Sequence, residues 1–66
     1  MTEEDARQRI QSAIDQYGQQ AGMAIDLVIS ETRSDLGVKT ANDLIEEFDL
    51  ELLYNIAPSE SDSSNS

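Results

Sequence analysis

The densest group of side chains that could do chemistry is a set of four acids in the stretch EEFDLE, residues 46–51. They are Glu46, Glu47, Asp49 and Glu51. Carboxylates bind calcium when they alternate along a loop that also holds a glycine for its sharp turn. This stretch has no glycine, and its intervening residues are large and apolar. The pattern therefore does not predict a calcium site and is typical of a solvated helix face.

The remaining side chains give little support for catalysis. The chain has neither histidine nor cysteine, so the usual general base near neutral pH and the thiolate ligands of zinc are missing. A serine nucleophile would need the single lysine, Lys39, as its activator. The three glycines are dispersed at Gly18, Gly22 and Gly37, and they build no phosphate-binding loop. We therefore expect a protein that is not an enzyme and that binds neither a cofactor nor a metal.

The stretch SDLGVKTANDLIEEFD, residues 34–49, has the outline of a helix-turn-helix. Gly37 can end one helix, and Thr40 can cap the next, with Asp43 in the capping-box position three residues later. DNA-reading helices contact phosphates and bases mostly through Arg, Lys, Asn and Gln. The second helix here is acidic and has no basic residue after Lys39. We therefore expect no direct nucleic-acid binding and an ordinary corner between two helices.

The elements around this corner are also helical in pattern. Thr2 can cap a first helix, with Asp5 in the capping-box position, and Gly18 suits its C-terminal end. Its apolar residues recur at steps of three and four, as on one helix face. They are Ala6, Ile10, Ala13, Ile14 and Tyr17.

The segment that follows, residues 19–37, is apolar on most of its circumference. One predicted helix face holds Ala21, Ala24, Ile25, Val28, Thr32 and Leu36. Met23 and Leu27 form a second stripe on the far side, so we expect a central helix with neighbours on both sides. A strand is the alternative, because Met23, Ile25, Leu27 and Ile29 alternate, but no second strand-like run is present to pair with it.

The third predicted helix has more apolar residues than one face can bury. Its core-facing stripe is Ala41, Leu44, Ile45, Phe48 and Leu52. If the helix continues at about 100° per residue, Leu50 and Tyr54 point away from this stripe and Leu53 lies between the two. Large apolar residues left outside a small monomer mark an interface. The alternative is a turn near Asp49 that folds this segment back over its own core.

These patterns predict a small all-α domain of three helices, with four as the alternative, over residues 2–57. Residues 58–66 are rich in Ser, Asp and Glu and lack apolar side chains, so we expect a disordered acidic tail. Fourteen acidic residues against four basic ones give a net charge of -10, which opposes binding to phosphate backbones and anionic membranes. Adaptation to a salt-rich host is an alternative reason for the acidity. The polar N-terminal stretch and the absence of a spanning segment predict a cytoplasmic protein that binds no membrane.

The expected function is that of a small protein-interaction module, a regulator or adaptor, whose partner has a basic surface. The expected partner-binding residues are Asp43, Glu46, Glu47, Leu50, Glu51, Leu53 and Tyr54. One alternative is an inhibitor that mimics nucleic acid and occupies the groove of a DNA- or RNA-binding protein. A second alternative is a homo-oligomeric structural subunit, a homodimer with Leu50, Leu53 and Tyr54 at its two-fold axis.

Overall fold

The computed structural model describes residues 1–58, and in this part of the chain all the regular secondary structure is helical. The elements are α1 (Glu3–Tyr17), the 3-10 turn η1 (Gly18–Gln20), α2 (Gly22–Leu36), α3 (Val38–Glu47) and α4 (Leu50–Tyr54). The all-α prediction is confirmed, with a fourth helix present, and the strand alternative for the second segment is wrong. The predicted tail lies outside the described residues except for Pro58. None of the helices described is long and apolar enough to cross a lipid bilayer.

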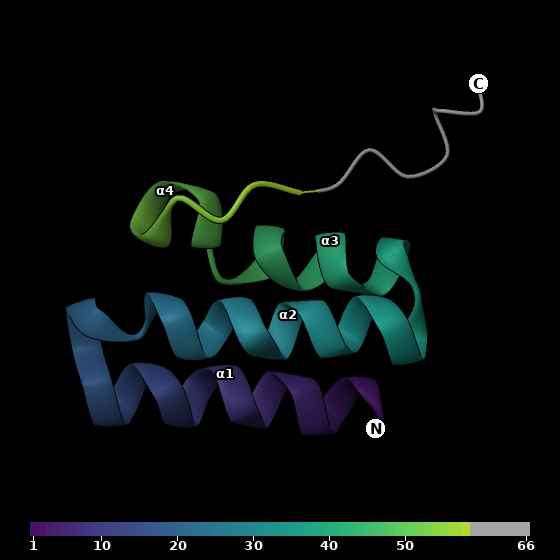
Figure 1. The fold of residues 1–66 in the computed structure, drawn as a ribbon, viewed down its shortest axis with the longest axis horizontal. Coiled ribbons are helices and arrows are strands. Elements are labelled where there is room, and N and C mark those ends of the chain that lie inside the picture. Colours follow the sequence, from purple (N-terminus) through teal and green to yellow (C-terminus); the bar gives the residue numbers. More distant parts are fainter. Residues whose placement is uncertain (59–66) are drawn as a thin grey trace.

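The helices lie side by side, with α2 between α1 and α3 (Figure 1). α1 and α2 run in opposite directions, and α3 turns back along α2 (Figure 1). The short α4 lies at the end of the molecule where η1 joins α1 to α2 (Figure 1). The central position predicted for the second helix is therefore correct, but the expectation that neighbours would cover both of its apolar stripes is wrong, because Met23 and Leu27 are exposed.

Local signals set the boundaries of α1. The Asp5 backbone N–H donates to the Thr2 hydroxyl at 3.1 Å, and the Thr2 N–H donates to the Asp5 carboxylate at 3.4 Å. This reciprocal capping box satisfies two donors that the first helical turn leaves free. Gly18, with φ 57°, ends the helix in a conformation that favours glycine. Both predicted ends of α1 are confirmed.

The corner between α2 and α3 is tighter than the sequence suggested. Gly37, with φ 104° and ψ 161°, is the only residue between the two helices, and its N–H donates to the Thr32 carbonyl. α3 therefore begins at Val38, and the prediction that Thr40 caps it is wrong because Thr40 already lies inside the first turn. Asp43 does not close a capping box; its carboxylate lies 3.5 Å from the Lys39 ammonium.

The core gathers small and branched residues from all four helices and from the chain after α4. Its buried apolar members are Ala6, Ile10, Ala13, Ala21, Ile25, Val28, Ile29, Ala41, Leu44, Ile45, Leu50 and Ile56. The buried Thr32 hydroxyl donates to the Val28 carbonyl at 2.8 Å, which satisfies the one buried polar side chain of this core. Ile29 is fully buried, although the predicted face of the second helix did not include it.

Asp49 decides how the last helix meets this core. It adopts a left-handed conformation, φ 58° and ψ 40°, that ends α3 and restarts the chain as α4. Leu50 is consequently buried with 0% of its surface exposed, whereas Leu52 is 78% exposed. The predicted placements of both leucines are wrong, because they assumed one continuous helix through Asp49. The structure has the turn that was the alternative.

Candidate interaction surface

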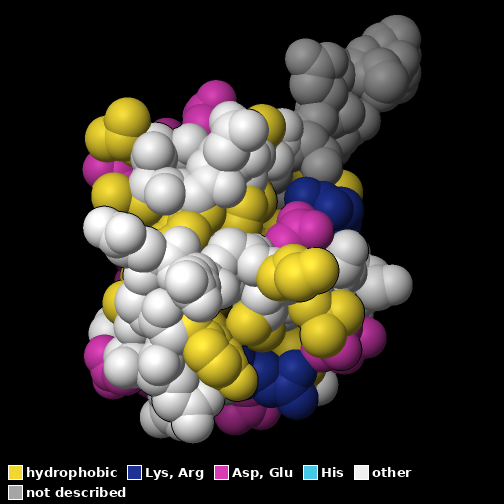
Figure 2. All heavy atoms as spheres, turned by 60° about the vertical axis from the view of Figure 1, so that its left-hand side comes forward, with side chains coloured by type: hydrophobic (Ala, Val, Ile, Leu, Met, Phe, Trp, Pro, Cys, Tyr) yellow, Lys and Arg dark blue, Asp and Glu magenta, His cyan; other side chains and the backbone are white. Residues whose placement is uncertain are grey.

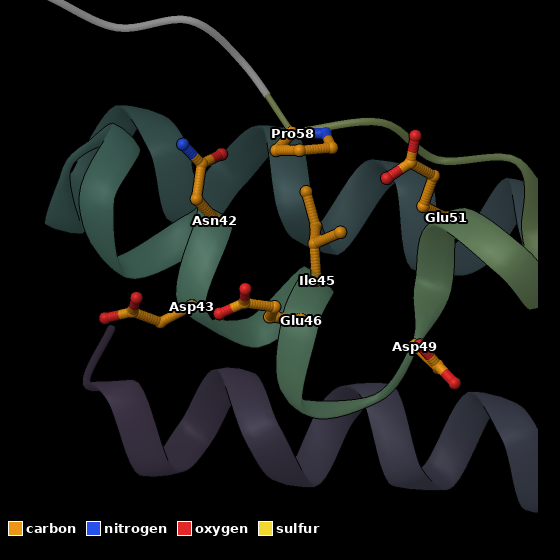
Figure 3. Close-up of a pocket in the computed structure, with 7 residues that line it drawn as sticks. All are labelled: Asn42, Asp43, Ile45, Glu46, Asp49, Glu51 and Pro58. Atoms are coloured by element: carbon orange, nitrogen blue, oxygen red, sulfur yellow. The ribbon is translucent and has the colours of Figure 1, made fainter.

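Three of the four acids of residues 46–51, together with Asp43, line a hollow between α3 and the chain that leaves α4 (Figure 3). The hollow has a volume of about 220 Å³. Its lining residues are Asn42, Asp43, Ile45, Glu46, Asp49, Glu51 and Pro58. Ile45 and Pro58 face one another across its apolar part, and Glu51 lies beside Pro58 (Figure 3). Four of the lining residues are acidic and none is basic, so the hollow presents a negative surface.

These carboxylates do not converge on one point. Figure 3 shows Asp43 and Asp49 pointing to opposite sides of the hollow. Within residues 1–58, no group of three or more His, Cys, Asp or Glu side chains is placed to hold a metal ion. The hollow therefore offers separate carboxylates to several cationic groups rather than one coordination site.

One predicted partner-binding acid, Glu47, lies elsewhere and has a partner within the chain. Its carboxylate accepts hydrogen bonds from Arg7 Nε at 2.8 Å and from Arg7 Nη2 at 3.1 Å. Arg7 also reaches Glu4 at 3.0 Å and Glu3 at 3.3 Å. The hydrogen bond from Arg7 lowers the pKa of Glu47, and burial opposes this shift more weakly. Glu47 thus connects α3 to α1 and is not part of the open acidic hollow.

The predicted apolar residues of the site are divided between core and surface. Leu50 is buried and cannot contact a partner. Tyr54 is half-buried; its hydroxyl donates to the Gly18 carbonyl at 2.8 Å, and its ring lies close to Gly22. Leu53 is 61% exposed, and the neighbouring Leu52, which had been placed in the core, is exposed as well. The open apolar pair on α4 is therefore Leu52 and Leu53.

Other large apolar side chains are also exposed, on α1 and α2. They are Tyr17, Met23 and Leu27. Figure 2 shows the end of the molecule at which η1 and α4 lie, with hydrophobic side chains spread over it and acidic ones mostly around its edge. The second stripe recognised in the sequence, Met23 and Leu27, is thus left uncovered by the other helices.

Comparison with known proteins adds no relative, since no family model, curated protein or solved structure matches the chain.

Proposed function

We propose that the chain is a small non-catalytic interaction module, a regulator or adaptor, that binds a protein partner with a basic surface. The contact surface is the acidic hollow of α3 and α4 together with Leu52 and Leu53, and we name it the α3–α4 surface. The observation that carries the proposal is that α4 exposes two adjacent leucines and also supplies Glu51 to a hollow lined by four acids and no base.

The leucines and the acids of the α3–α4 surface contribute to binding in different ways in this proposal. Leucine side chains gain about 1.5–3 kcal/mol each when they are fully buried, so Leu52 and Leu53 are suited to be anchors. Uncompensated carboxylates such as Glu46 and Glu51 attract a cationic surface and raise the rate of encounter. Electrostatic attraction at the rim adds less to affinity than to rate and selectivity.

This arrangement supports a protein interaction better than mimicry of nucleic acid. A mimic needs a ridge of unpaired acids that imitates the spacing of phosphates. Glu47 is held by Arg7, and Asp43 lies beside Lys39, so the acids of α3 alternate between free and paired. The large apolar side chains on α4 also have no counterpart in a phosphate backbone.

The test compares capture of proteins from the source organism by three immobilised forms of the chain. The unaltered chain and the control variant Tyr17→Ser, which removes a different exposed apolar side chain, should capture the same partner. The double variant Leu52→Ser/Leu53→Ser should lose it. Raising the salt from about 0.15 M to about 0.5 M should weaken capture of the partner by the unaltered chain. Equal capture by the control and the double variant would exclude the α3–α4 surface as the site.

A further inference from the structure

A second open surface runs along α2, opposite the core. Its centre is formed by Met23, Leu27, Ser30 and Ser34, all exposed, and we name it the α2 face. Met23 and Leu27 are 86% and 60% exposed. These four residues recur at steps of four, three and four, the spacing of the seam by which two helices pack together. Ser30 and Ser34 line one hollow of this face. A second hollow lies between the flank of α2 that includes Met23 and residues 54–57.

One flank of the α2 face carries an acid and a base without partners. Arg33 is the one basic side chain that makes no ion pair within residues 1–58, and its Nε is buried without a hydrogen-bond acceptor. Asp26 stands seven residues earlier, two turns along the same flank, and likewise has no ion pair in this part of the chain. Both residues line the larger hollow, which has a volume of about 530 Å³.

We infer that the α2 face binds a second copy of this chain, with the two α2 helices antiparallel about a two-fold axis. In an antiparallel pair, the residue numbers rise along one helix while those of the residues facing them on the other helix fall. When Leu27 faces Ser30 of the partner subunit, Met23 faces Ser34 of the partner subunit. Each large side chain then lies against a small one, which is how facing layers of helices fill space.

The same register pairs the unpartnered charges. Asp26 comes beside Arg33 of the partner subunit, and the two-fold symmetry repeats this contact with the roles exchanged. A parallel arrangement would instead put this flank of the two helices on opposite sides of the contact, so Asp26 and Arg33 could not pair across it. Two further acids, Glu31 and Asp35, lie near the face. Glu31 is paired with Arg9 at 2.6 Å, and Asp35 with the N-terminal ammonium at 3.6 Å. The α2 face is therefore close to neutral in a chain of net charge -10, which permits two copies to meet there.

This inference concerns a surface separate from the α3–α4 surface and stands independently of the proposed partner. One helix face buries less than the roughly 1,600 Å² of a standard interface, so we expect a weak dimer. The chain should self-associate at about 100 µM in about 0.15 M salt, measured by sedimentation equilibrium. The variant Met23→Ser/Leu27→Ser should sediment as a monomer, whereas Tyr17→Ser and Leu52→Ser/Leu53→Ser should remain dimeric. A monomeric unaltered chain at this concentration would overturn the inference.

Reciprocal charge changes test the register. Asp26→Arg alone places base against base, and Arg33→Asp alone places acid against acid, so each variant should associate about tenfold more weakly than the unaltered chain. An equimolar mixture of these two variants should recover the original association, and so should the doubly exchanged chain Asp26→Arg/Arg33→Asp. Circular dichroism checks that each variant is folded. If the folded variants associate as well alone as in the mixture, the antiparallel pairing is wrong.

Discussion

At the scale of single residues, Asp49 has the largest effect on which leucine side chains are exposed. Its left-handed backbone ends α3 at Glu47 and starts α4 at Leu50. A continuous helix would carry Leu52 into the core and Leu50 out of it. Aspartate tolerates this conformation better than most residues, because its short polar side chain makes local hydrogen bonds. The exposed leucines of the α3–α4 surface therefore depend on one backbone conformation.

Replacing Asp49 tests this dependence. Asp49→Val should destabilise the chain by about 1–3 kcal/mol, because a β-branched residue is strained in the left-handed region. Asp49→Gly should keep the turn and change the free energy of unfolding by less than about 1 kcal/mol. Urea denaturation of both variants measures the difference. If valine were tolerated as well as glycine, the turn at Asp49 would not be present in solution.

The neighbouring leucines provide a second test at this scale. Leu50→Ala should cost about 2–5 kcal/mol and leave much of this small domain unfolded, because Leu50 is fully buried. Leu52→Ala should change the free energy of unfolding by less than about 0.5 kcal/mol, because Leu52 lies largely in solvent. The two thermal unfolding curves give the comparison directly. The reverse order would show that the helix continues through Asp49.

At the scale of elements, α4 is the least self-sufficient part of the fold. It has five residues, too few for a helix that is stable alone, and its position depends on tertiary contacts. Leu50 and Ile56 fix its two ends in the core, and the Tyr54 hydroxyl fixes its outer side to Gly18. The left-handed Asn55 lets the Ile56 N–H reach the Leu50 carbonyl at 3.2 Å and returns the chain to the core. The α3–α4 surface is thus displayed by an element that the core holds in place.

Sequence patterns predicted the elements with strong local signals and missed those set by tertiary contacts. The capping box at Thr2, the glycine ends and the apolar period identified α1 and α2, because these signals act within a few residues. The start of α3 was misplaced because Gly37 makes the whole corner and leaves Thr40 inside the helix. The turn at Asp49 has no glycine to mark it, so the orientation of Leu50 and Leu52 could not be decided from periodicity. Four of the seven predicted site residues, Asp43, Glu46, Glu51 and Leu53, do lie on the α3–α4 surface.

The contact between α1 and α3 through Arg7 and Glu47 should make stability depend on pH. Because Arg7 lowers the pKa of Glu47 in the folded chain, the contribution is present above the ordinary glutamate pKa of about 4.3. It is lost as the pH falls through the lowered pKa. Glu47→Gln should therefore be less stable than the unaltered chain at about pH 7, with the difference disappearing near pH 2.5.

Urea midpoints across this pH range measure the effect. The matched control is Glu46→Gln, which removes the adjacent carboxylate and breaks no ion pair. Its difference from the unaltered chain should not follow the same pH dependence. A gap between Glu47→Gln and the unaltered chain that persisted to low pH would exclude the ion pair as its cause.

At the scale of the whole molecule, the charge is not evenly distributed among the surfaces. The α2 face has its acids balanced by Arg9, Arg33 and the N-terminal ammonium, whereas the hollow of α3 and α4 has four acids and no base in its lining. Exposed apolar residues accompany both surfaces. This division agrees with our proposals, in which the neutral surface self-associates and the acidic one binds a basic partner. The two functions can be removed separately by variants that leave the core unchanged.

The most direct measurement of the central claim is site-specific photo-crosslinking in cells of the source organism. A photo-reactive phenylalanine derivative replaces Leu53 on the α3–α4 surface in one form and the exposed Gln8 of α1 in a control form. Irradiation should join the Leu53 position to a distinct protein through a peptide from a lysine- or arginine-rich surface, while the Gln8 position should give no such product. Adducts of the same protein at both positions, or none at the Leu53 position, would contradict the assignment of this surface as the partner-binding site.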